Sequence, residues 1–547
     1  MFLKITKSNG YQYVRIVRSY WKDGKSRQQV VLNLGRLDIL KQAGQLKRLG
    51  KQLLALDGED IPTLDELEEL SRLCYGDIVY KKLWDKYQFT AILTGVIKDK
   101  RIQYDFLQTA YLLVVDRLLN PRSKLACFKR QGKYINIEDV KLQHLYRSLD
   151  LLAEAKTSLE TTIFDRQKDL FHQSVDVVFY DVTTFHFESN RADELKEFGF
   201  SKAGKFNEVQ VLMGLLIDME GNPIGYDLFP GNTFEGNTLL DALSALKQRF
   251  SIRKIIFVAD KALNSKKNLH LIKAAGYDYI VSARLKNSSK KITKELFKSQ
   301  DYHSLTVDQT TGEVTFKYKV LKDHRFSYRD EQGSTHQLTD NLIITWSADR
   351  AQRDCKDRER QIAKAQKMID KQHKIGAKKG YQRYIATEGE HKVVGLDEAR
   401  IAEDALWDGY YGIQTSETNL DATAVIEAYH QLWKIEQSFR VLKSTMRTRP
   451  IFHWTGKRIK GHFVACFMAF VLERALENKL KANNIAASPE TIKEAIQSLE
   501  VSEIMLRGER YYLKAKQLPL ASKILNVLRI KHLRNISSKE EIAAHFD

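Results

Sequence analysis

The order of apolar runs between Val175 and Ala283 constrains the fold more than any other feature of this sequence. Three strand-like runs come first, and helix-like and strand-like segments then alternate. Turn-forming residues at Glu220–Pro223 predict a hairpin between the second and third strands. This order is typical of a mixed sheet covered by helices, so we predict an α/β core. The segments are Val175–Tyr180, Val209–Ile217, Ile224–Phe229, Leu239–Phe250, Ile255–Ala259, Lys266–Ala275 and Tyr279–Ala283.

Carboxylates follow two of these apolar strands. Asp181 comes directly after Tyr180, and Asp260 comes directly after Ala259. In open α/β sheets, functional side chains gather at strand ends, where the chain leaves the core. Two acids on neighbouring strands form a hard-oxygen site that suits Mg²⁺ or Mn²⁺. A single aspartate at a strand end is more often a loop cap than a metal ligand. The interpretation of this pair as a metal site therefore depends on a third element.

The third element is a helix that the spacing predicts over Thr423–Thr448, with Pro450 as its stop signal. Two stripes run along it at helical spacing. The apolar stripe suits packing against a core and consists of Leu432, Ile435, Phe439, Leu442 and Met446. The polar stripe consists of Tyr429, Trp433, Glu436, Arg440, Lys443 and Arg447. It presents one carboxylate among cations that suit phosphate, although a solvated face with ion pairs explains the polar stripe about equally well.

These residues resemble the DDE transposases of bacterial insertion sequences, of the insertion-sequence-four type. Tyr429, Glu436 and Lys443 have the spacing of that family's tyrosine–arginine–glutamate–lysine signature. Asp181, within Asp-x-Thr, and Asp260 precede them in the family's order. Weaker similarities are Asn120–Lys124, Gly231–Thr233 and Asp408–Gly409. The signature's arginine position is occupied by a leucine of the apolar stripe, Leu432, which puts the phosphate contact at that position in doubt.

The resemblance implies a ribonuclease-H-like catalytic core and a transposase that cuts DNA at the element's ends and joins those ends to target DNA. It implies two Mg²⁺ or Mn²⁺ ions, bridged by Asp181 and held also by Asp260 and Glu436. The DNA contacts expected from it are Tyr429, Trp433, Arg440, Lys443 and Arg447. For Trp433, stacking on a displaced base competes with helix packing, which explains this residue slightly better.

The remaining segments predict how this core sits within the chain. A chain of 547 residues exceeds what one core usually supports. Strand-like runs at Tyr11–Val17 and Gln28–Leu34, split by a turn at Asp23–Gly24, predict a β-rich N-terminal region. The expected regions are 1–60, basic and DNA-end binding; 61–168, helical; 169–285 with 406–480, the core; 286–405, a β-rich insertion; and 481–547, helical. Helices are expected at Leu64–Leu73, Phe106–Leu119, Asp349–Lys371 and Gly461–Leu480.

The charge of the chain points to its partners. Lysine and arginine number 88 against 69 acids, a formal charge of +19, which favours a polyanion. The longest apolar stretch, Phe463–Leu472, is too short to cross a bilayer. No CxxC pair is present among the four cysteines, so neither a zinc site nor a disulfide framework is expected. We expect a cytoplasmic protein with no membrane partner, which binds double-stranded DNA with terminal inverted repeats and target DNA as a homodimer.

Three other readings of the same residues remain open. A host nuclease with the same core would cut DNA without joining strands. A domesticated, non-catalytic DNA-binding protein would bind DNA without metal-dependent cleavage. A basic RNA-binding protein would fit the charge, but the sequence has no aromatic ribonucleoprotein motif.

Overall fold

A computed structural model gives the structure of the chain, in two units. It describes all residues except 43, 59–67, 138–139, 172–176, 190, 200–206, 234–237, 240, 242–249, 251–255, 261–262, 309–310, 371–379, 389–391, 507–508 and 547, with the backbone alone at 167–171 and 392. The first unit comprises Met1–Arg72, Val501–Lys514 and Leu533–Ile542. The second comprises Leu73–Glu500, Ala515–His532 and Ala543–Asp547.

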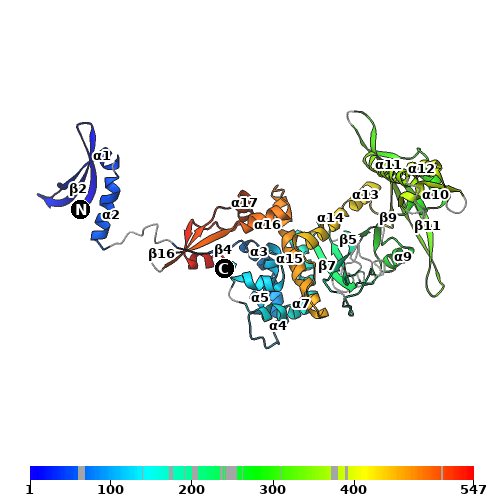
Figure 1. Ribbon diagram of the computed structural model, residues 1–547, viewed down its shortest axis with the longest axis horizontal. Coiled ribbons are helices and arrows are strands. Elements are labelled where there is room, and N and C mark those ends of the chain that lie inside the picture. Colours follow the sequence, from blue (N-terminus) through cyan, green and yellow to red (C-terminus); the bar gives the residue numbers. More distant parts are fainter. Residues whose placement is uncertain are drawn as a thin grey trace. The chain divides into compact units, whose positions relative to one another are not determined.

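The first unit contains two sheets. One is the meander β1 (Phe2–Ser8), β2 (Tyr11–Lys22) and β3 (Lys25–Arg36), and α1 (Leu37–Gln42) packs against it before α2 (Gln45–Leu56) (Figure 1). Asp23 and Gly24 both have positive φ, 54° and 71°, as a tight hairpin turn requires. The predicted turn and strands are confirmed. The second sheet has the order β18-β17-β16-β4: Ile536–Ser537, Glu509–Lys514, Glu500–Leu506 and Glu68–Cys74.

A nine-stranded sheet forms the centre of the second unit. Its order is β10-β11-β12-β15-β9-β8-β5-β6-β7. β5, β8 and β9 run parallel to one another, and every other neighbouring pair is antiparallel. In the same order the strands are His303–Val307, Val314–Arg329, Thr335–Ser347, Tyr410–Thr415, Asp278–Ala283, Ile256–Ala259, Val177–His186, Gln210–Ile217 and Pro223–Pro230. The mixed α/β sheet predicted from the sequence is confirmed.

Helices cover both faces of the part of this sheet formed by β5–β9, which explains why these strands are nearly continuous apolar runs. On one face, Val178, Tyr180 and Val182 of β5 pack with Phe257 of β8 and with α9 (Lys266–Ala274). The opposite face meets α13 (Ala422–His430), α14 (Trp433–Arg440), the π-helical turn η6 (Val441–Thr445) and α15 (Gly456–Ala482). The predicted helix Leu239–Phe250 lies mostly outside the described residues.

α15 joins the sheet to a helical layer. It is buried along most of its length, because α5 (Phe106–Leu119) and α7 (Leu142–Phe171) pack against it. Gly461 permits this contact, since a Cβ there would lie 1.8 Å from the carbonyl oxygen of Leu149. The layer also contains α3 (Ile78–Lys86), α4 (Phe89–Ile97), α6 (Lys124–Arg130), η2 (Gln131–Lys133), α16 (Pro489–Gln497) and α17 (Pro519–Val527). The helix predicted at Phe106–Leu119 is confirmed, and Ser123 caps α6 by accepting from the Ala126 N–H at 3.2 Å.

Three sequence predictions need correction. The described part of Leu64–Leu73 belongs to strand β4, because pairing with β16 outweighs a weak helical period. The tail after residue 480 contains strands β16–β18 as well as α16, α17 and α18 (Lys539–Ala543). The helix predicted over Thr423–Thr448 is three pieces, since a turn at Gln431–Leu432 separates α13 from α14 and η6 follows.

The segment 286–405 adds strands to the nine-stranded sheet and also forms a two-stranded sheet of β13 (Ile385–Glu388) and β14 (Lys392–Leu396). β12 pairs with β15, so β10–β12 extend the sheet at one end. The segment also contains η4 (Leu285–Asn287), α10 (Lys290–Phe297), α11 (Ala348–Asp370), η5 (Gly380–Tyr384) and α12 (Glu398–Ala405). The segment thus combines strands with helices, and α11 lies where the sequence predicts the helix Asp349–Lys371.

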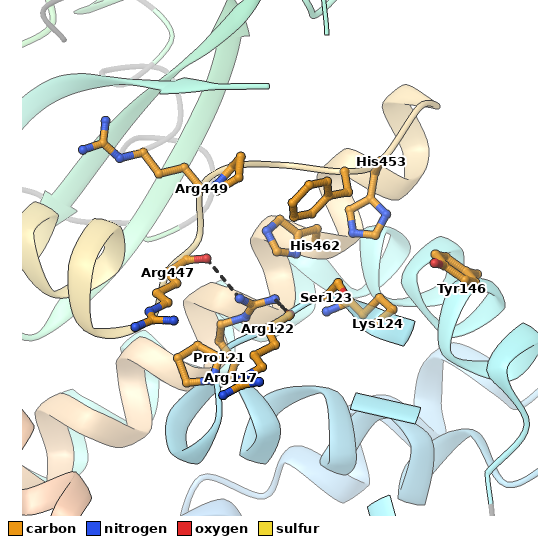
Figure 2. Close-up of a pocket in the computed structure, with 12 residues that line it drawn as sticks. Arg117, Pro121, Arg122, Ser123, Lys124, Tyr146, Arg447, Arg449, His453 and His462 are labelled. Atoms are coloured by element: carbon orange, nitrogen blue, oxygen red, sulfur yellow. Dashed lines mark hydrogen bonds between the residues drawn. The ribbon is translucent and has the colours of Figure 1, made fainter. Parts of the chain in front are cut away.

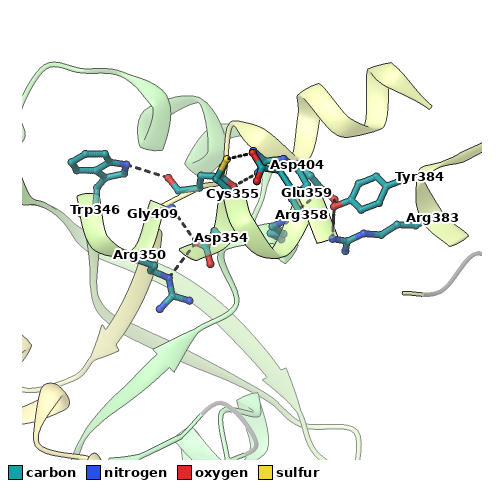
Figure 3. Close-up of polar contacts among 12 residues, drawn as sticks. Trp346, Arg350, Asp354, Cys355, Arg358, Glu359, Arg383, Tyr384, Asp404 and Gly409 are labelled. Carbon is teal, nitrogen blue, oxygen red and sulfur yellow. Dashed lines mark hydrogen bonds and ion pairs between the residues drawn. The ribbon is translucent and has the colours of Figure 1, made fainter. Parts of the chain in front are cut away.

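Polar contacts fix how the chain returns from this segment to β15 (Figure 3). Asp354 of α11 accepts from the Gly409 N–H at 3.0 Å, and the Trp346 indole donates to the Asp408 carbonyl at 3.1 Å. Arg358 binds the Asp408 carboxylate. Gly409 has φ 83°, and a Cβ there would lie 2.7 Å from the Trp346 indole nitrogen, so only glycine fits this turn.

None of the helices in the described part of the chain is long and apolar enough to cross a membrane.

Candidate active site

The sequence predicts that the strand ends at Asp181. In the structure, Asp181 lies within β5. The strand continues to His186, and Asp181 pairs with Leu215 of β6. The parallel partner β8, however, pairs only with Val177–Phe179. Asp181 therefore stands just past the point where this neighbour ends. Its carboxylate is half-buried, and its Oδ1 accepts from the Val182 N–H at 2.8 Å.

The register brings Asp260 beside Asp181. Phe179 of β5 pairs with Val258 of β8. Asp181 follows Phe179 by two residues, and Asp260 follows Val258 by two residues. Because side chains alternate along a strand, both aspartates share the face opposite the Val178–Tyr180 core. Neighbouring strands lie about 5 Å apart. Asp260 is exposed, so this pair of carboxylates opens to solvent.

A chain of hydroxyl groups lies next to Asp260. Tyr411 of β15 donates to the Ser282 hydroxyl of β9 at 2.5 Å and shares a hydrogen bond with the Tyr429 hydroxyl. Burial raises the pKa of Tyr429, and Tyr411 and the Asp260 carboxylate raise it further. Tyr429 thus remains a protonated phenol close to Asp260. Ser282 and Tyr411 had no motif to mark them in the sequence.

Lys443, in η6, connects the helical segment that begins with α13 to β5, the strand that contains Asp181. Its ammonium donates to the Thr183 hydroxyl and lies 5.4 Å from the centre of the Phe185 ring. Thr183 and Phe185 have the same parity as Asp181 along β5, so Lys443 approaches the face that carries Asp181. Thr183, like Ser282, is a site residue that the sequence analysis missed, although the Asp-x-Thr phrase contains it.

Glu436 lies midway between these two attachments, seven residues after Tyr429 and seven before Lys443. Its helix, α14, contacts β5, and its side chain is exposed. Trp433, with 53% of its surface exposed, does not pack as a core residue would. The other residues of the predicted DNA-binding row, Arg440 and Arg447, are also exposed.

The apolar stripe of the same segment is confirmed. All five residues are buried, at 8% exposure or less: Leu432, Ile435, Phe439, Leu442 and Met446. Leu432 therefore has a packing role at the position where the signature has arginine.

The donor set suits a hard divalent cation without forming a closed cage. Among the described residues, no three His, Cys, Asp or Glu side chains come close enough together to hold a metal ion. Mg²⁺ commonly takes only one or two carboxylates and fills its remaining positions with water and substrate phosphate. Asp181 and Asp260, on neighbouring parallel strands, provide such a pair.

Comparison with known proteins identifies the family. A model of the transposase DDE domain matches residues 173–472, and a model of the IS1634 family transposase N-terminal domain matches residues 3–66. No curated protein sequence matches the chain. Among solved structures, a piggyBac transposase synaptic complex with hairpin DNA shares 10% identity over 78% of this chain and 80% of that one, with a TM-score of 0.32. A Mos1 transposase paired-end complex with the left transposon end shares 12% identity over 33% and 59%, with a TM-score of 0.14.

Because the DDE-domain model spans more than half of the chain, the chain belongs to the transposase DDE-domain family. It is a DDE-type DNA transposase, and the N-terminal match agrees with an insertion-sequence origin.

Proposed function

We propose that Asp181, Asp260 and Glu436 are the catalytic carboxylates of this transposase, within a ribonuclease-H-like core. The observation that carries the proposal is the β5–β8 register, which sets Asp181 and Asp260 side by side on one face. The order β7-β6-β5-β8-β9, an antiparallel meander followed by two parallel strands, supports this choice of core.

Two Mg²⁺ or Mn²⁺ ions, when bound, would supply Lewis acidity for activating a nucleophile and stabilising a leaving oxygen. Asp181, Asp260 and Glu436 are the residues that would hold these ions. The turn at Gln431–Leu432 lets α14 follow β5, and the contact of α14 with β5 supports Glu436 as the third ligand.

The remaining side chains hold DNA and order the site. Lys443, attached to Thr183, would contact a phosphate beside Asp181. Tyr429, buried and bonded to Tyr411, would act as a hydrogen-bond donor that positions Asp260. Exposed Trp433 is free of core packing and suits stacking on a displaced base.

The partners we propose follow from this chemistry and the charge. They are double-stranded DNA with terminal inverted repeats, read by residues 1–60, and target DNA. Aromatic and basic side chains gather on β2, where Trp21 is 78% exposed, and such surfaces suit DNA. Two ends must meet during transposition, which favours a homodimer on DNA. The Tyr429–Glu436–Lys443 spacing supports the insertion-sequence-four type.

The test is metal-dependent cleavage of a duplex that carries the element's own end. Glu436→Gln and Asp181→Asn should abolish cleavage while DNA binding in a gel shift stays nearly unchanged, because each substitution removes a metal ligand. The matched control is Glu494→Gln, an exposed glutamate of α16 that should leave cleavage intact. Normal cleavage by Glu436→Gln would remove the third ligand from the proposal. Strand joining by the wild type separates a transposase from a nuclease, and absence of all cleavage would favour the non-catalytic alternative.

A further inference from the structure

A basic pocket of about 370 Å³ lies in the second unit, between the start of α6 and the chain that follows η6 (Figure 2). Five of the twelve residues that line it are lysine or arginine, and none is aspartate or glutamate. The cations are Arg117, Arg122, Lys124, Arg447 and Arg449. A pocket with this lining has the chemistry of an anion site.

Lys124 is the most informative of these cations. Only 5% of its surface is exposed, and within the described part of the chain no hydrogen bond or ion pair holds its ammonium. Burial, and then the nearby Arg117, lower its pKa to about 8. The buried carboxylate that acts on it, Asp116, is already in contact with Arg130 at 3.5 Å. A buried cation is costly unless it is paired, and an anion that entered the pocket would pair with it.

The guanidinium of Arg117 forms part of the pocket wall, because backbone carbonyls accept its hydrogen bonds. Its Nη1 donates to the carbonyls of Met446 at 3.2 Å and Arg447 at 3.1 Å, and its Nη2 donates to the carbonyl of Arg122 at 3.4 Å. One guanidinium thus holds together the segment before α6 and the segment after η6, as Figure 2 shows for the Arg447 contact. The pocket is therefore fixed before any ligand enters.

Aromatic rings complete the lining. His453 packs against Tyr146, with the ring centres 6.2 Å apart, and burial lowers the pKa of His453 to about 3. Its ring is neutral near pH 7, so the positive charge of the pocket comes from lysine and arginine. Phe452 is 54% exposed at the same site. Cations beside an exposed ring suit a nucleotide, which presents a phosphate and a flat base.

The pocket lies within reach of DNA in the active site. The Ile451 N–H donates to the His186 carbonyl at 3.4 Å, so the pocket wall runs beside the end of β5. His186 follows Asp181 by five residues, about 17 Å along a strand. The pocket wall therefore contacts the strand that carries Asp181, five residues past that aspartate.

We propose that this pocket binds a backbone phosphate of the transposon DNA, away from the bond that is cut, with Lys124 as its central cation and Phe452 beside the base. The proposal rests on the function above only for the position of the cut. The phosphate contact itself does not require Asp181 or Glu436 to be catalytic.

The first experiment measures binding of a mixed-sequence duplex by Lys124→Met as a function of salt. Losing one phosphate contact should lower the salt slope by about one, so that the affinity loss between about 50 and 200 mM salt becomes about 3.5 times smaller. The control is Lys129→Met, an exposed lysine of the same helix outside the pocket, which should keep the wild-type slope. A thermal melt of Lys124→Met should match or exceed that of the wild type, because an unpaired buried charge is removed.

The second experiment locates the contact on a duplex that carries the element's end. When neutral methylphosphonates replace the phosphates one at a time, one position away from the cut should weaken wild-type binding but not binding by Lys124→Met. An unchanged salt slope for Lys124→Met, or an equal effect of Lys129→Met, overturns the pocket. The proposal is also overturned if inorganic phosphate raises the melting temperature of the wild type but not of Lys124→Met, while both proteins bind DNA with the same affinity. Cleavage by Asp181→Asn would overturn the catalytic proposal and leave the salt result standing.

Discussion

Replacing Gly461 with alanine tests the packing that holds α15 against α7. The added Cβ would lie 1.8 Å from the carbonyl oxygen of Leu149 and 2.5 Å from its carbonyl carbon. Carbon–oxygen contacts need about 3.3 Å, so the helices must separate by roughly 1.5 Å. Overpacking costs about 1–3 kcal/mol, and we expect the upper end because the obstacle is backbone. A loss of about 3 kcal/mol lowers the melting temperature by roughly 6–12 °C on the scale of domains of 150–250 residues.

The control for Gly461→Ala is Gly95→Ala in α4, where a Cβ would meet nothing within 4 Å. Alanine should stabilise that helix by about 0.5–1 kcal/mol. Thermal melts and urea titrations of both variants measure the difference. The reasoning is refuted if Gly461→Ala is as stable as the wild type, or if the two substitutions shift stability in the same direction. Cleavage should fall with Gly461→Ala, since Phe463 of α15 packs on Phe185 of β5 with ring centres 5.3 Å apart.

Three further substitutions extend these tests. Leu432→Ala should lower the free energy of unfolding by roughly 2–5 kcal/mol, because the leucine is buried, and a urea titration measures it. Lys443→Met should weaken DNA binding across sequences and lower the salt slope by about one in a gel shift; an unchanged slope would leave Lys443 with its Thr183 contact alone. Burial raises the pKa of Glu473 to about 8, so the folded state holds a proton that the unfolded state releases, and stability should fall as pH rises from about 4.5 to 8. Glu473→Gln keeps the Tyr80 partner without the charge, so its melting temperature should change less over that range; an identical pH profile would contradict this.

Strands of the central sheet were predictable where their signal is local. Val209–Ile217 and Ile224–Phe229 are apolar runs bounded by turn residues, and they match β6 and β7 within a residue or two. The pattern also fixed which side of the Thr423–Thr448 segment is buried, because packing of residues such as Leu432 and Met446 follows the helical period.

Features that depend on long-range pairing were not predictable. β5 continues past Asp181 because β6 pairs with it as far as His186, and nothing near Asp181 marks this. The turn at Gln431–Leu432 has no glycine or proline, so no local signal breaks the helix there. Tyr411 meets Tyr429 only because β15 joins β9, which the sequence cannot reveal without the sheet order.

The pairing of β15 with β9 also bears on how this core can change in length. Ala283 and Gly412 are register partners, so the long segment between them, which supplies β10–β12 to the same sheet, starts and ends at adjacent positions. The entropy of closing a flexible loop grows only with the logarithm of its length, and lengthening a four-residue hairpin about thirtyfold costs roughly 3 kcal/mol. Added segments that fold on themselves recover that cost. The β9–β15 junction is therefore a point where insertions or deletions of whole modules leave the register of Asp181 and Asp260 untouched, and where a shortened transposase is best designed.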